Sequence, residues 1–347
     1  MKIGLVGFPG SGKTTLFNAL TGMDVPVGFG GELRVGTVKV PDRRVDRLSE
    51  IFRPKKTTHA EVVFCDVPGE HGAKGQGLSR KALQQIRDQD ALCLVLRDFD
   101  NPGIQGDPDP EGELYSFVSE CLLADLEIVE RRLARLRKER SEKREVEQLE
   151  LLKAKLEAEV PLRLIAEEEA DKRFLRGYAL LTDKPLLVVL NRREEHAGAA
   201  GLPDELSRRI EAVGARGLAL SASVEAEIAR LDPKDQEVFL ADMGMTEPVL
   251  HRFVRAAYHL QDLISFFTVG KEDVRAWTIT KGTAARRAAG TIHSDLERGF
   301  IRAEITPYDV FVQYGSEAAV KDAGRLRVEG AGYVVQDGDI MHVRFNV

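Results

Sequence analysis

Short apolar runs alternate with helical patterns along most of the chain. These runs are rich in β-branched residues or leucine, and they cover Lys2–Val6, Val62–Asp66, Leu92–Leu96, Leu186–Leu190 and Gly217–Leu220. Runs of this length without polar alternation are typical of strands that are buried on both faces. Because helical patterns separate them, the sequence predicts an α/β fold in which helices cover both faces of a parallel sheet.

Two apolar stripes at coiled-coil spacing lie between the third and the fourth of these runs. They advance in steps of three or four residues and consist of Leu122, Leu126, Val129, Leu133 and Leu136, then Val146, Leu149, Leu152 and Leu156. Residues 137–145 between them have no apolar side chain, which suits the exposed tip of an antiparallel helical hairpin. One long helix with a solvated middle is an alternative that this pattern leaves open.

The last part of the chain has a different pattern. Asp337 and Gly338 form a turn-prone pair between two extended runs, and Met341, Val343 and Phe345 then alternate with polar neighbours. An Asp-Gly pair tolerates the positive φ of a tight hairpin turn. The sequence therefore predicts a terminal hairpin that ends in a half-buried strand, within a small α+β domain.

Composition and charge narrow the class of protein. The 347 residues are 43% hydrophobic and 31% charged, as in globular proteins. The net charge of -6 argues against a generally cationic nucleic-acid-binding protein, so we expect no binding of DNA, and any contact with RNA must come from a local patch. No apolar run approaches the roughly 18 residues that span a bilayer, and the first run leads into a glycine-rich motif instead of a signal-peptide cleavage site. Three widely spaced cysteines indicate neither a disulfide framework nor a zinc site. We expect a cytoplasmic monomer without membrane contact.

A glycine-rich loop follows the first predicted strand and opens a helical pattern. Its sequence, GFPGSGKT over residues 7–14, matches a phosphate-binding P-loop. Successive backbone N–H groups of such a loop turn toward an anion, the Lys13 ammonium neutralises the β- and γ-phosphates, and Thr14 offers its hydroxyl to Mg²⁺. The expected nucleotide-binding residues here are Gly7, Pro9, Gly10, Ser11, Gly12, Lys13, Thr14 and Thr15.

The second predicted strand ends in the pattern Asp-x-x-Gly, from Asp66 to Gly69. A carboxylate at this point can hold the water shell of Mg²⁺, and the glycine N–H can touch the γ-phosphate. We therefore expect Thr14 and Asp66 to bind the metal and Gly69 to bind nucleotide.

The fourth predicted strand ends in Asn-Arg-Arg-Glu, from Asn191 to Glu194. Guanine-specific proteins have Asn-Lys-x-Asp here, and that Asp accepts hydrogen bonds from N1–H and the 2-amino group of guanine. Adenine has neither donor, so Glu194 in place of this Asp removes the main reason for preferring guanine. In the alternative, Glu194 still reaches guanine or lies in solvent. The expected base-side residues are Asn191, Arg192, Glu194, Ser221, Ala222 and Ser223.

With these motifs the chain resembles the YchF or Obg-like ATPase family of translation-factor-related P-loop proteins. The matching segments include Val40–Asp42, Asp66–Gly69, Gly75–Leu78, Ala124–Glu127, Asn191–Glu194 and Ser221–Glu227, and in the last domain Ser265–Thr268, Arg275–Ile279, Gly299–Glu304, Asp337–Asp339 and Arg344–Val347. The resemblance implies a P-loop fold with an inserted coiled coil, a C-terminal TGS domain, an adenine-preferring ATP hydrolase that uses Mg²⁺, and association with the ribosome through its RNA or protein.

The chain departs from the family pattern at three places. Gly10 stands where relatives carry an Asn associated with monovalent-cation binding, so potassium stimulation is not expected. The switch I threonine that completes the Mg²⁺ shell in relatives falls on residues 29–31, which are Phe-Gly-Gly, and Thr37 is a possible substitute out of register. After Asp-x-x-Gly, this chain has Glu70 and His71 where the family has a hydrophobic residue.

This last departure suggests a catalytic hypothesis. Glu70 or His71 could orient or deprotonate the attacking water, while Lys13 stabilises charge on the transferred phosphoryl group. The alternative for both residues is a solvated loop. Because the motifs contain no clear arginine finger, we expect slow turnover that a partner raises.

The expected division of the chain follows from these motifs. Residues 1–110 and 180–262 form a split P-loop nucleotide-binding domain, residues 111–179 a coiled-coil insertion, and residues 263–347 a TGS-like domain. The expected function is a slow, Mg²⁺-dependent ATPase that acts as a ribosome-linked conformational switch. A protein that senses ATP with negligible hydrolysis and a GTP-binding protein are the alternatives.

Overall fold

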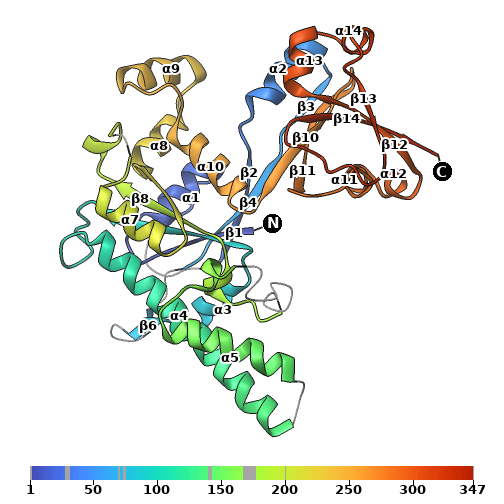
Figure 1. Cartoon of the computed structure of the whole chain (residues 1–347). Helices are drawn as coiled ribbons and strands as arrows, with labels where there is room; N and C mark the ends of the chain where they lie inside the picture. Colours follow the sequence, from blue (N-terminus) through green and yellow to red (C-terminus); the bar gives the residue numbers. More distant parts are fainter. Residues whose placement is uncertain are drawn as a thin grey trace. The chain divides into compact units, whose positions relative to one another are not determined.

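The chain forms two compact units. Figure 1 shows the whole chain, coloured by residue number from blue at the N-terminus to red at the C-terminus. Unit 1 comprises Met1–Val38 and Val63–Phe253, and unit 2 comprises Lys39–Val62 and Val254–Val347. The computed structural model describes residues 2–27, 32–68, 71–72, 76–139, 143–166, 177–199 and 201–346. Within these ranges, no helix has the length and apolar character needed to cross a membrane.

Unit 1 is built on a six-stranded sheet in the order β2-β4-β1-β7-β8-β9. The strands are β1 (Lys2–Val6), β2 (Arg34–Lys39), β4 (Glu61–Asp66), β7 (Ala91–Asp98), β8 (Leu186–Arg192) and β9 (Arg216–Leu220). Strands β4, β1, β7, β8 and β9 run parallel, and β7 and β8 are buried along nearly their whole length. The predicted parallel α/β sheet is confirmed, because all five apolar runs form its strands.

Helices cover this sheet, and the chain segments between strands supply them. The helices are α1 (Lys13–Thr21), α3 (Arg80–Arg87), α4 (Pro110–Glu139), α5 (Lys143–Glu157), α7 (Asp204–Ala212), α8 (Ala222–Ile228), α9 (Pro233–Asp242) and α10 (Val249–His259), with short 3₁₀ turns at Leu162–Leu164, Leu181–Asp183 and Glu194–His196. A two-stranded ribbon, β5 (His71–Gly72) and β6 (Gln76–Leu78), precedes α3. The P-loop motif thus lies between β1 and α1, as the sequence predicts.

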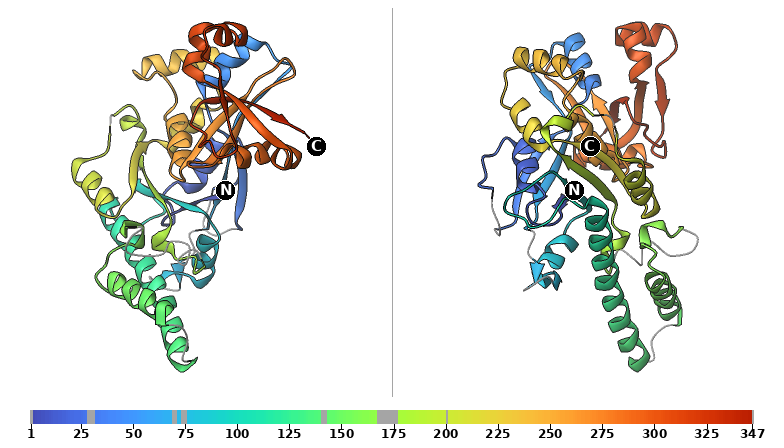
Figure 2. Two further views of the ribbon diagram at one scale, coloured as in Figure 1. Left: turned by 45° about the vertical axis from the view of Figure 1, so that its right-hand side comes forward. Right: turned by 90° about the vertical axis from the view of Figure 1, so that its left-hand side faces the viewer.

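The inserted segment is a hairpin of two helices, α4 and α5, which lie side by side in Figures 1 and 2. The predicted stripes face each other, since Val129, Leu133 and Leu136 of α4 share one buried cluster with Leu149 and Leu152 of α5. Ion pairs flank this seam between Arg132 and Glu145 (2.7 Å), between Lys153 and Glu130 (2.8 Å), and between Arg137 and Glu150 (2.5 Å). This arrangement excludes the alternative of one long helix.

Unit 2 contains a mixed six-stranded sheet in the order β13-β12-β14-β10-β11-β3. Its strands are β3 (Lys56–Thr58), β10 (Leu263–Thr268), β11 (Asp273–Thr280), β12 (Phe300–Pro307), β13 (Arg327–Glu329) and β14 (Asp339–Phe345), and its helices are α2 (Arg43–Phe52), α11 (Ala285–Ile292), α12 (Ser294–Arg298), α13 (Tyr308–Tyr314) and α14 (Glu317–Asp322). Phe266 and Ile305 are buried in a core with Ala288 of α11. The small α+β unit expected at the C-terminus is therefore present.

An early segment of the chain, residues 39–62, also belongs to unit 2. Its strand β3 extends the sheet by pairing in parallel with β11, with Lys56 opposite Asp273. The Arg44 guanidinium donates hydrogen bonds to Asp337 (2.8 Å) and lies over the ring of Phe267 (5.1 Å). The sequence-based division placed these residues in the nucleotide-binding range 1–110, so the compact units differ from it here. The cause is a set of contacts with residues far along the chain, which no local pattern encodes.

The predicted terminal hairpin is wrong in its pairing. β14 pairs antiparallel with β12 and parallel with β10, whereas the residues just before Asp337 form only an isolated bridge, Ala284 with Val334. Gly338 does adopt the expected positive φ of 88°, but Asp337 accepts a hydrogen bond from the Ser265 amide (2.9 Å) and thereby joins the turn to β10. An Asp-Gly pair predicts the turn, and it does not determine which strand the chain meets next.

Candidate nucleotide site

The P-loop begins at the end of β1 and closes on the first turn of α1. Gly12 precedes α1 with φ 89°, and a Cβ at this position would overlap the Asn191 side-chain amide. Glycine is thus required by the backbone conformation and by the neighbour. Gly7, Pro9 and Ser11 lie in the same loop, which places its N–H groups at the N-terminus of a nine-residue helix. Such an end is a site for an anion.

Lys13 is held inside this loop. Its ammonium donates hydrogen bonds to the carbonyl oxygens of Gly7 (2.7 Å) and Phe8 (2.9 Å), and the residue is 7% exposed. Burial lowers the pKa of Lys13 to about 8, against the opposing effect of the Asp66 and Glu113 carboxylates. A bound phosphate would offer the ammonium stronger acceptors than the two carbonyl groups.

Thr14 and Asp66 come together as the sequence predicts. The Thr14 hydroxyl donates a hydrogen bond to Oδ2 of Asp66 (3.0 Å), the residue that ends β4 and is 5% exposed. Burial raises the pKa of Asp66, while Thr14, Lys13 and Arg34 act in the opposite direction. One hydroxyl and one carboxylate are hard oxygen ligands, which suit Mg²⁺ because this ion keeps several waters and shares phosphate oxygens. The residues present therefore fit the metal.

Arg34, the first residue of β2, is a neighbour that the sequence motifs did not single out. Its Nη1 lies 3.6 Å from Asp66 Oδ2. Thr37, the suggested substitute for the missing switch threonine, is exposed, and strand alternation directs its side chain to the face opposite Arg34 and Gly36. Residues 28–31, where the switch threonine of relatives falls, lie outside the described residues.

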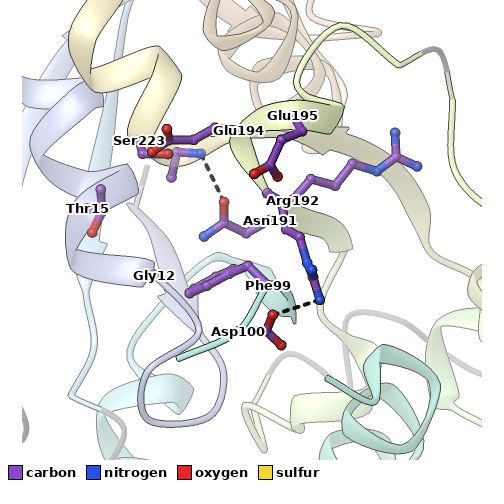
Figure 3. Close-up of a pocket in the computed structure, with 11 residues that line it drawn as sticks. Gly12, Thr15, Phe99, Asp100, Asn191, Arg192, Glu194, Glu195 and Ser223 are labelled. Carbon is purple, nitrogen blue, oxygen red and sulfur yellow. Dashed lines mark hydrogen bonds and ion pairs between the residues drawn. The ribbon is translucent and has the colours of Figure 1, made fainter. Parts of the chain in front are cut away.

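Asn191 joins the P-loop to the segment after β9. Its Nδ2 donates a hydrogen bond to the Ser11 carbonyl (2.9 Å), and its Oδ1 accepts one from the Ala222 amide (2.9 Å). The dashed line that reaches Asn191 in Figure 3 marks the second of these bonds. Ser221 precedes the first residue of α8, and its hydroxyl lies 3.1 Å from that of Ser223. Asn191 thus links the P-loop to the start of α8, where Ser221, Ala222 and Ser223 lie.

A cavity of about 440 Å³ opens beside Asn191 (Figure 3). Its lining consists of Gly12, Thr15, Phe99, Asp100, Asn191, Arg192, Arg193, Glu194, Glu195, Ala222 and Ser223. Seven of these belong to the predicted set, and the sequence did not predict Phe99, Asp100, Arg193 and Glu195. Arg193 forms an ion pair with Asp100 (3.0 Å) across the cavity wall. Phe99 and Asp100 directly follow β7. Ligands of parallel α/β sheets bind at the carboxyl ends of the strands, so the position of these residues after the predicted run Leu92–Leu96 could have indicated them.

The loop after β7 packs on the P-loop at Gly10. The Asn101 side chain donates a hydrogen bond to the Gly10 carbonyl (3.1 Å), and a Cβ at Gly10 would lie 2.8 Å from atoms of Asn101 and Ile104. Gly10 also has φ 75°. A larger residue here, such as the asparagine of relatives, would displace this loop, which gives a structural reason for the glycine.

The loop after the Asp-x-x-Gly motif contains the predicted catalytic residues Glu70 and His71. Gly69 and Glu70 lie outside the described residues, and of His71 only the backbone, in β5, is described. Within the described part of the chain, no cluster of three or more His, Cys, Asp or Glu side chains is arranged to hold a metal ion. The two oxygen-bearing side chains predicted to hold the metal, Thr14 and Asp66, do lie together, at 3.0 Å.

Two family profiles match the chain. One, described as a 50S ribosome-binding GTPase, matches residues 2–131, and the other, named for the C-terminal region of YchF and described as a protein of unknown function, matches residues 263–346. The boundary at residue 263 coincides with the start of β10.

Curated relatives match over the full chain. The Ribosome-binding ATPase YchF of Bacillus subtilis (strain 168) is 40% identical over 364 residues and both chains are covered completely. The protein of the same name from Haemophilus ducreyi (strain 35000HP / ATCC 700724) is 39% identical over 360 residues, which cover 100% of this chain and 99% of the relative.

Two solved structures resemble the chain in fold. The YchF GTPase of Schizosaccharomyces pombe superposes with a TM-score of 0.89 at 30% identity, over 99% of this chain and 97% of that one. A GTP-binding protein from Pyrococcus horikoshii OT3 has a TM-score of 0.60 at 20% identity, which supports the fold alone. Because curated relatives match over the full length and the YchF profile matches the C-terminal region, the chain belongs to the YchF family.

Proposed function

We propose that this protein binds ATP together with Mg²⁺, hydrolyses it slowly, and acts as a monomeric, cytoplasmic conformational switch on the ribosome. The names of its curated relatives, which describe ribosome-binding ATPases, support the activity and the partner. The inference to this chain draws on identity of about two residues in five over the whole length.

The observation that carries the proposal is the position of Asn191. Its side chain ties the P-loop carbonyl of Ser11 to the amide of Ala222, and both Asn191 and Ala222 line the 440 Å³ cavity. A phosphate-binding loop is thus continuous with a cavity large enough for a nucleoside. This continuity supports a nucleotide as the ligand, because inorganic phosphate needs only the loop.

Glu194 supports adenine as the base. It lines the cavity at the position where guanine-specific proteins have the Asp that reads N1–H and the 2-amino group. The carboxylate of Glu194 sits on a side chain one methylene longer and follows two arginines in place of Lys-x. A site without the matched acceptor loses most of its discrimination in favour of guanine.

The phosphate end of the site supports hydrolysis. Bound Mg²⁺ supplies charge neutralisation of the phosphates. Lys13 exchanges its two carbonyl acceptors for phosphate oxygens, and the backbone N–H groups of residues 10–14 hold the anion in place. Thr14 and Asp66 would hold the metal. Glu70 and His71 remain candidates for orienting the attacking water, and we expect slow turnover because the sequence motifs contain no clear arginine finger.

The remaining contacts complete the assignment. The proposed nucleotide-binding set is Gly7, Pro9, Gly10, Ser11, Gly12, Lys13, Thr14, Thr15, Gly69, Asn191, Arg192, Glu194, Ser221, Ala222 and Ser223. We extend it by Phe99, Asp100, Arg193 and Glu195, because these four line the same cavity. A GTP-binding protein stays the second candidate, since the S. pombe structure at 30% identity is described as that of a GTPase.

Phosphate release tests the enzymatic part of the proposal. ATP turnover of the wild-type chain is measured with Mg²⁺, with and without ribosomes, beside Lys13→Ala. We expect slow release that rises when ribosomes are added and disappears in Lys13→Ala. Release that does not depend on Lys13, or no release even with ribosomes, would overturn the ATPase and leave an ATP-sensing protein.

A further inference from the structure

Strand β2 brings a positive charge to the metal end of the site. Gly36 is buried on one face of this strand, and Arg34, two residues earlier, shares that face. The Arg34 side chain is 30% exposed, whereas that of Asp66 is 7% exposed. Arg34 therefore reaches from partial solvent exposure toward a carboxylate that is nearly sealed from water.

Arg34 and Thr14 approach the same carboxylate oxygen. Asp66 Oδ2 accepts the hydrogen bond from the Thr14 hydroxyl at 3.0 Å and has Arg34 Nη1 at 3.6 Å. Lys13 donates to backbone carbonyl groups instead of to Asp66. Among the residues that the structure describes, Arg34 is thus the cation in ion-pair contact with this carboxylate.

A buried carboxylate needs a compensating positive charge. Mg²⁺ supplies this charge when it is bound, and the ion would be held by the same two side chains, Thr14 and Asp66. A guanidinium and a divalent cation placed around one carboxylate repel each other, so the two cannot both keep their closest positions.

We propose that Arg34 is the resident cation of the magnesium site: it balances the charge of Asp66 when no metal is bound, and it gives up this carboxylate when Mg²⁺ enters with the nucleotide. The inference rests on the proposed Mg²⁺-dependent nucleotide binding. Arg34 is a positioning residue in this role, because it acts on the metal through Asp66. Its consequence is that the Mg²⁺ concentration needed for tight nucleotide binding is set by competition with a side chain of the protein itself.

Titration of nucleotide affinity against Mg²⁺ tests this role without measuring turnover. The probe is AMPPNP, a non-hydrolysable ATP analogue, added to the full chain while free Mg²⁺ is varied from none to saturation. In Arg34→Ala the half-saturating Mg²⁺ concentration should fall by about 2- to 5-fold, which is the range expected for a partly exposed ion pair. AMPPNP binding without Mg²⁺ should weaken, because Asp66 then faces the phosphates without its ion-pair partner and with only the longer-range charge of Lys13 opposing it.

Further variants test whether the change in Mg²⁺ requirement comes from the contact between Arg34 and Asp66. Arg34→Lys keeps the charge and should lie between wild type and Arg34→Ala. Arg230→Ala, which removes an exposed arginine beyond α8, should behave as wild type. In an Asp66→Asn background, Arg34→Ala should no longer change the Mg²⁺ dependence, because the group for which the two cations compete is gone.

The outcomes separate this inference from the proposed function. An unchanged or raised Mg²⁺ requirement in Arg34→Ala, with wild-type thermal stability, would overturn the role of Arg34 while leaving nucleotide binding intact. If Arg34→Ala fails to fold, the same comparison is made with Arg34→Lys. The half-saturating Mg²⁺ concentration of Arg34→Lys must then lie below that of wild type. Failure of wild type to bind AMPPNP at any Mg²⁺ concentration would instead overturn the proposed function.

Discussion

Asn191 connects the two halves of the nucleotide site through a single side-chain amide. Its two hydrogen bonds, to the Ser11 carbonyl and from the Ala222 amide, are both 2.9 Å long, and the residue is 4% exposed. Both partners are backbone groups at the ends of elements, so the bonds fix the P-loop relative to the start of α8. Loss of this side chain would leave two buried backbone groups without a partner, which is the costly kind of hydrogen-bond loss.

We expect Asn191→Ala to weaken ATP binding by about 10- to 100-fold, equivalent to about 1.4 to 2.7 kcal/mol, because both backbone partners lose their bond. Titration with a fluorescent ATP analogue measures the change. Asn346→Ala, an exposed asparagine near the C-terminus, is the matched control and should retain wild-type affinity. Affinity within a factor of two of wild type in Asn191→Ala would show that the amide does not organise the site.

The sequence reveals the residues of this site that belong to continuous motifs. Lys13, Thr14 and Asp66 could be assigned because the P-loop and Asp-x-x-Gly have fixed spacing at strand ends. Arg34 and Phe99 could not, because no motif contains them and they reach the site only through the pairing of β2 with β4 and the path of the loop after β7. Gly10 was recognised as a departure, and its steric reason needed the positions of Asn101 and Ile104.

At the scale of elements, helix α2 is fixed to the sheet of unit 2 by charge and by ring packing. Asp42 caps the helix by accepting from the Arg44 amide (2.9 Å), and the same carboxylate and that of Asp337 share the Arg44 guanidinium. Phe52, at the other end of α2, stacks on Phe311 with 5.3 Å between ring centroids. Burial raises the pKa of Asp337, but Arg44 and the Ser265 amide outweigh it, so the pKa lies below its usual value.

This ion pair predicts a pH-dependent stability of unit 2. A carboxyl group with a folded-state pKa below its unfolded value adds stability above the unfolded pKa, and this stability disappears as the pH falls through the folded pKa. Asp337→Asn should therefore lower the free energy of unfolding by about 1–2 kcal/mol at pH 7, allowing for partial exposure, and the gap to wild type should close toward pH 3.

Urea unfolding followed by tryptophan fluorescence measures the free energy of unfolding of unit 2. Trp277 is the single tryptophan of the chain and lies in β11, so its emission reports on unit 2. Asp309→Asn, at an exposed position of α13, is the control. A gap between wild type and Asp337→Asn that stays constant from pH 7 to pH 3 would contradict a role for the ionised carboxylate.

At the scale of the whole molecule, the overall charge of -6 confines any contact with ribosomal RNA to local surfaces. We expect the tip of the helical hairpin to be one such surface. Arg132 and Arg137 are paired with Glu145 and Glu150 across the seam, while Lys138 and Lys143 flank the tip with exposed side chains. The lysines are thus placed to meet a phosphate backbone.

Reversing these two charges should weaken ribosome binding. We expect Lys138→Glu combined with Lys143→Glu to reduce cosedimentation with ribosomes by about 3- to 10-fold, with a smaller dependence on salt, because two cationic contacts become repulsive. The double variant Arg230→Glu with Lys234→Glu makes the same change in charge at the start of α9 and should bind as wild type does. Equal losses in both double variants would indicate an effect of net charge alone.

The order of elements along the chain was predictable, and the grouping of distant segments was not. Apolar runs and the two leucine stripes gave the sheet and the hairpin, because local periodicity encodes both. The membership of residues 39–62 in unit 2 depends on the pairing of Lys56 with Asp273 and of Arg44 with Asp337, more than 200 residues apart in each case. Contacts at such separation leave no local signal.

Competition between ATP and GTP for one site tests whether the protein prefers adenine nucleotides. Displacement of a fluorescent ATP analogue by each nucleotide is measured with Mg²⁺ for wild type, for Glu194→Asp, and for the exposed control Glu227→Asp on α8. We predict that ATP displaces the probe at lower concentration than GTP in wild type and in the control, and that Glu194→Asp narrows the difference. Tighter binding of GTP than of ATP to the wild-type protein would contradict the account.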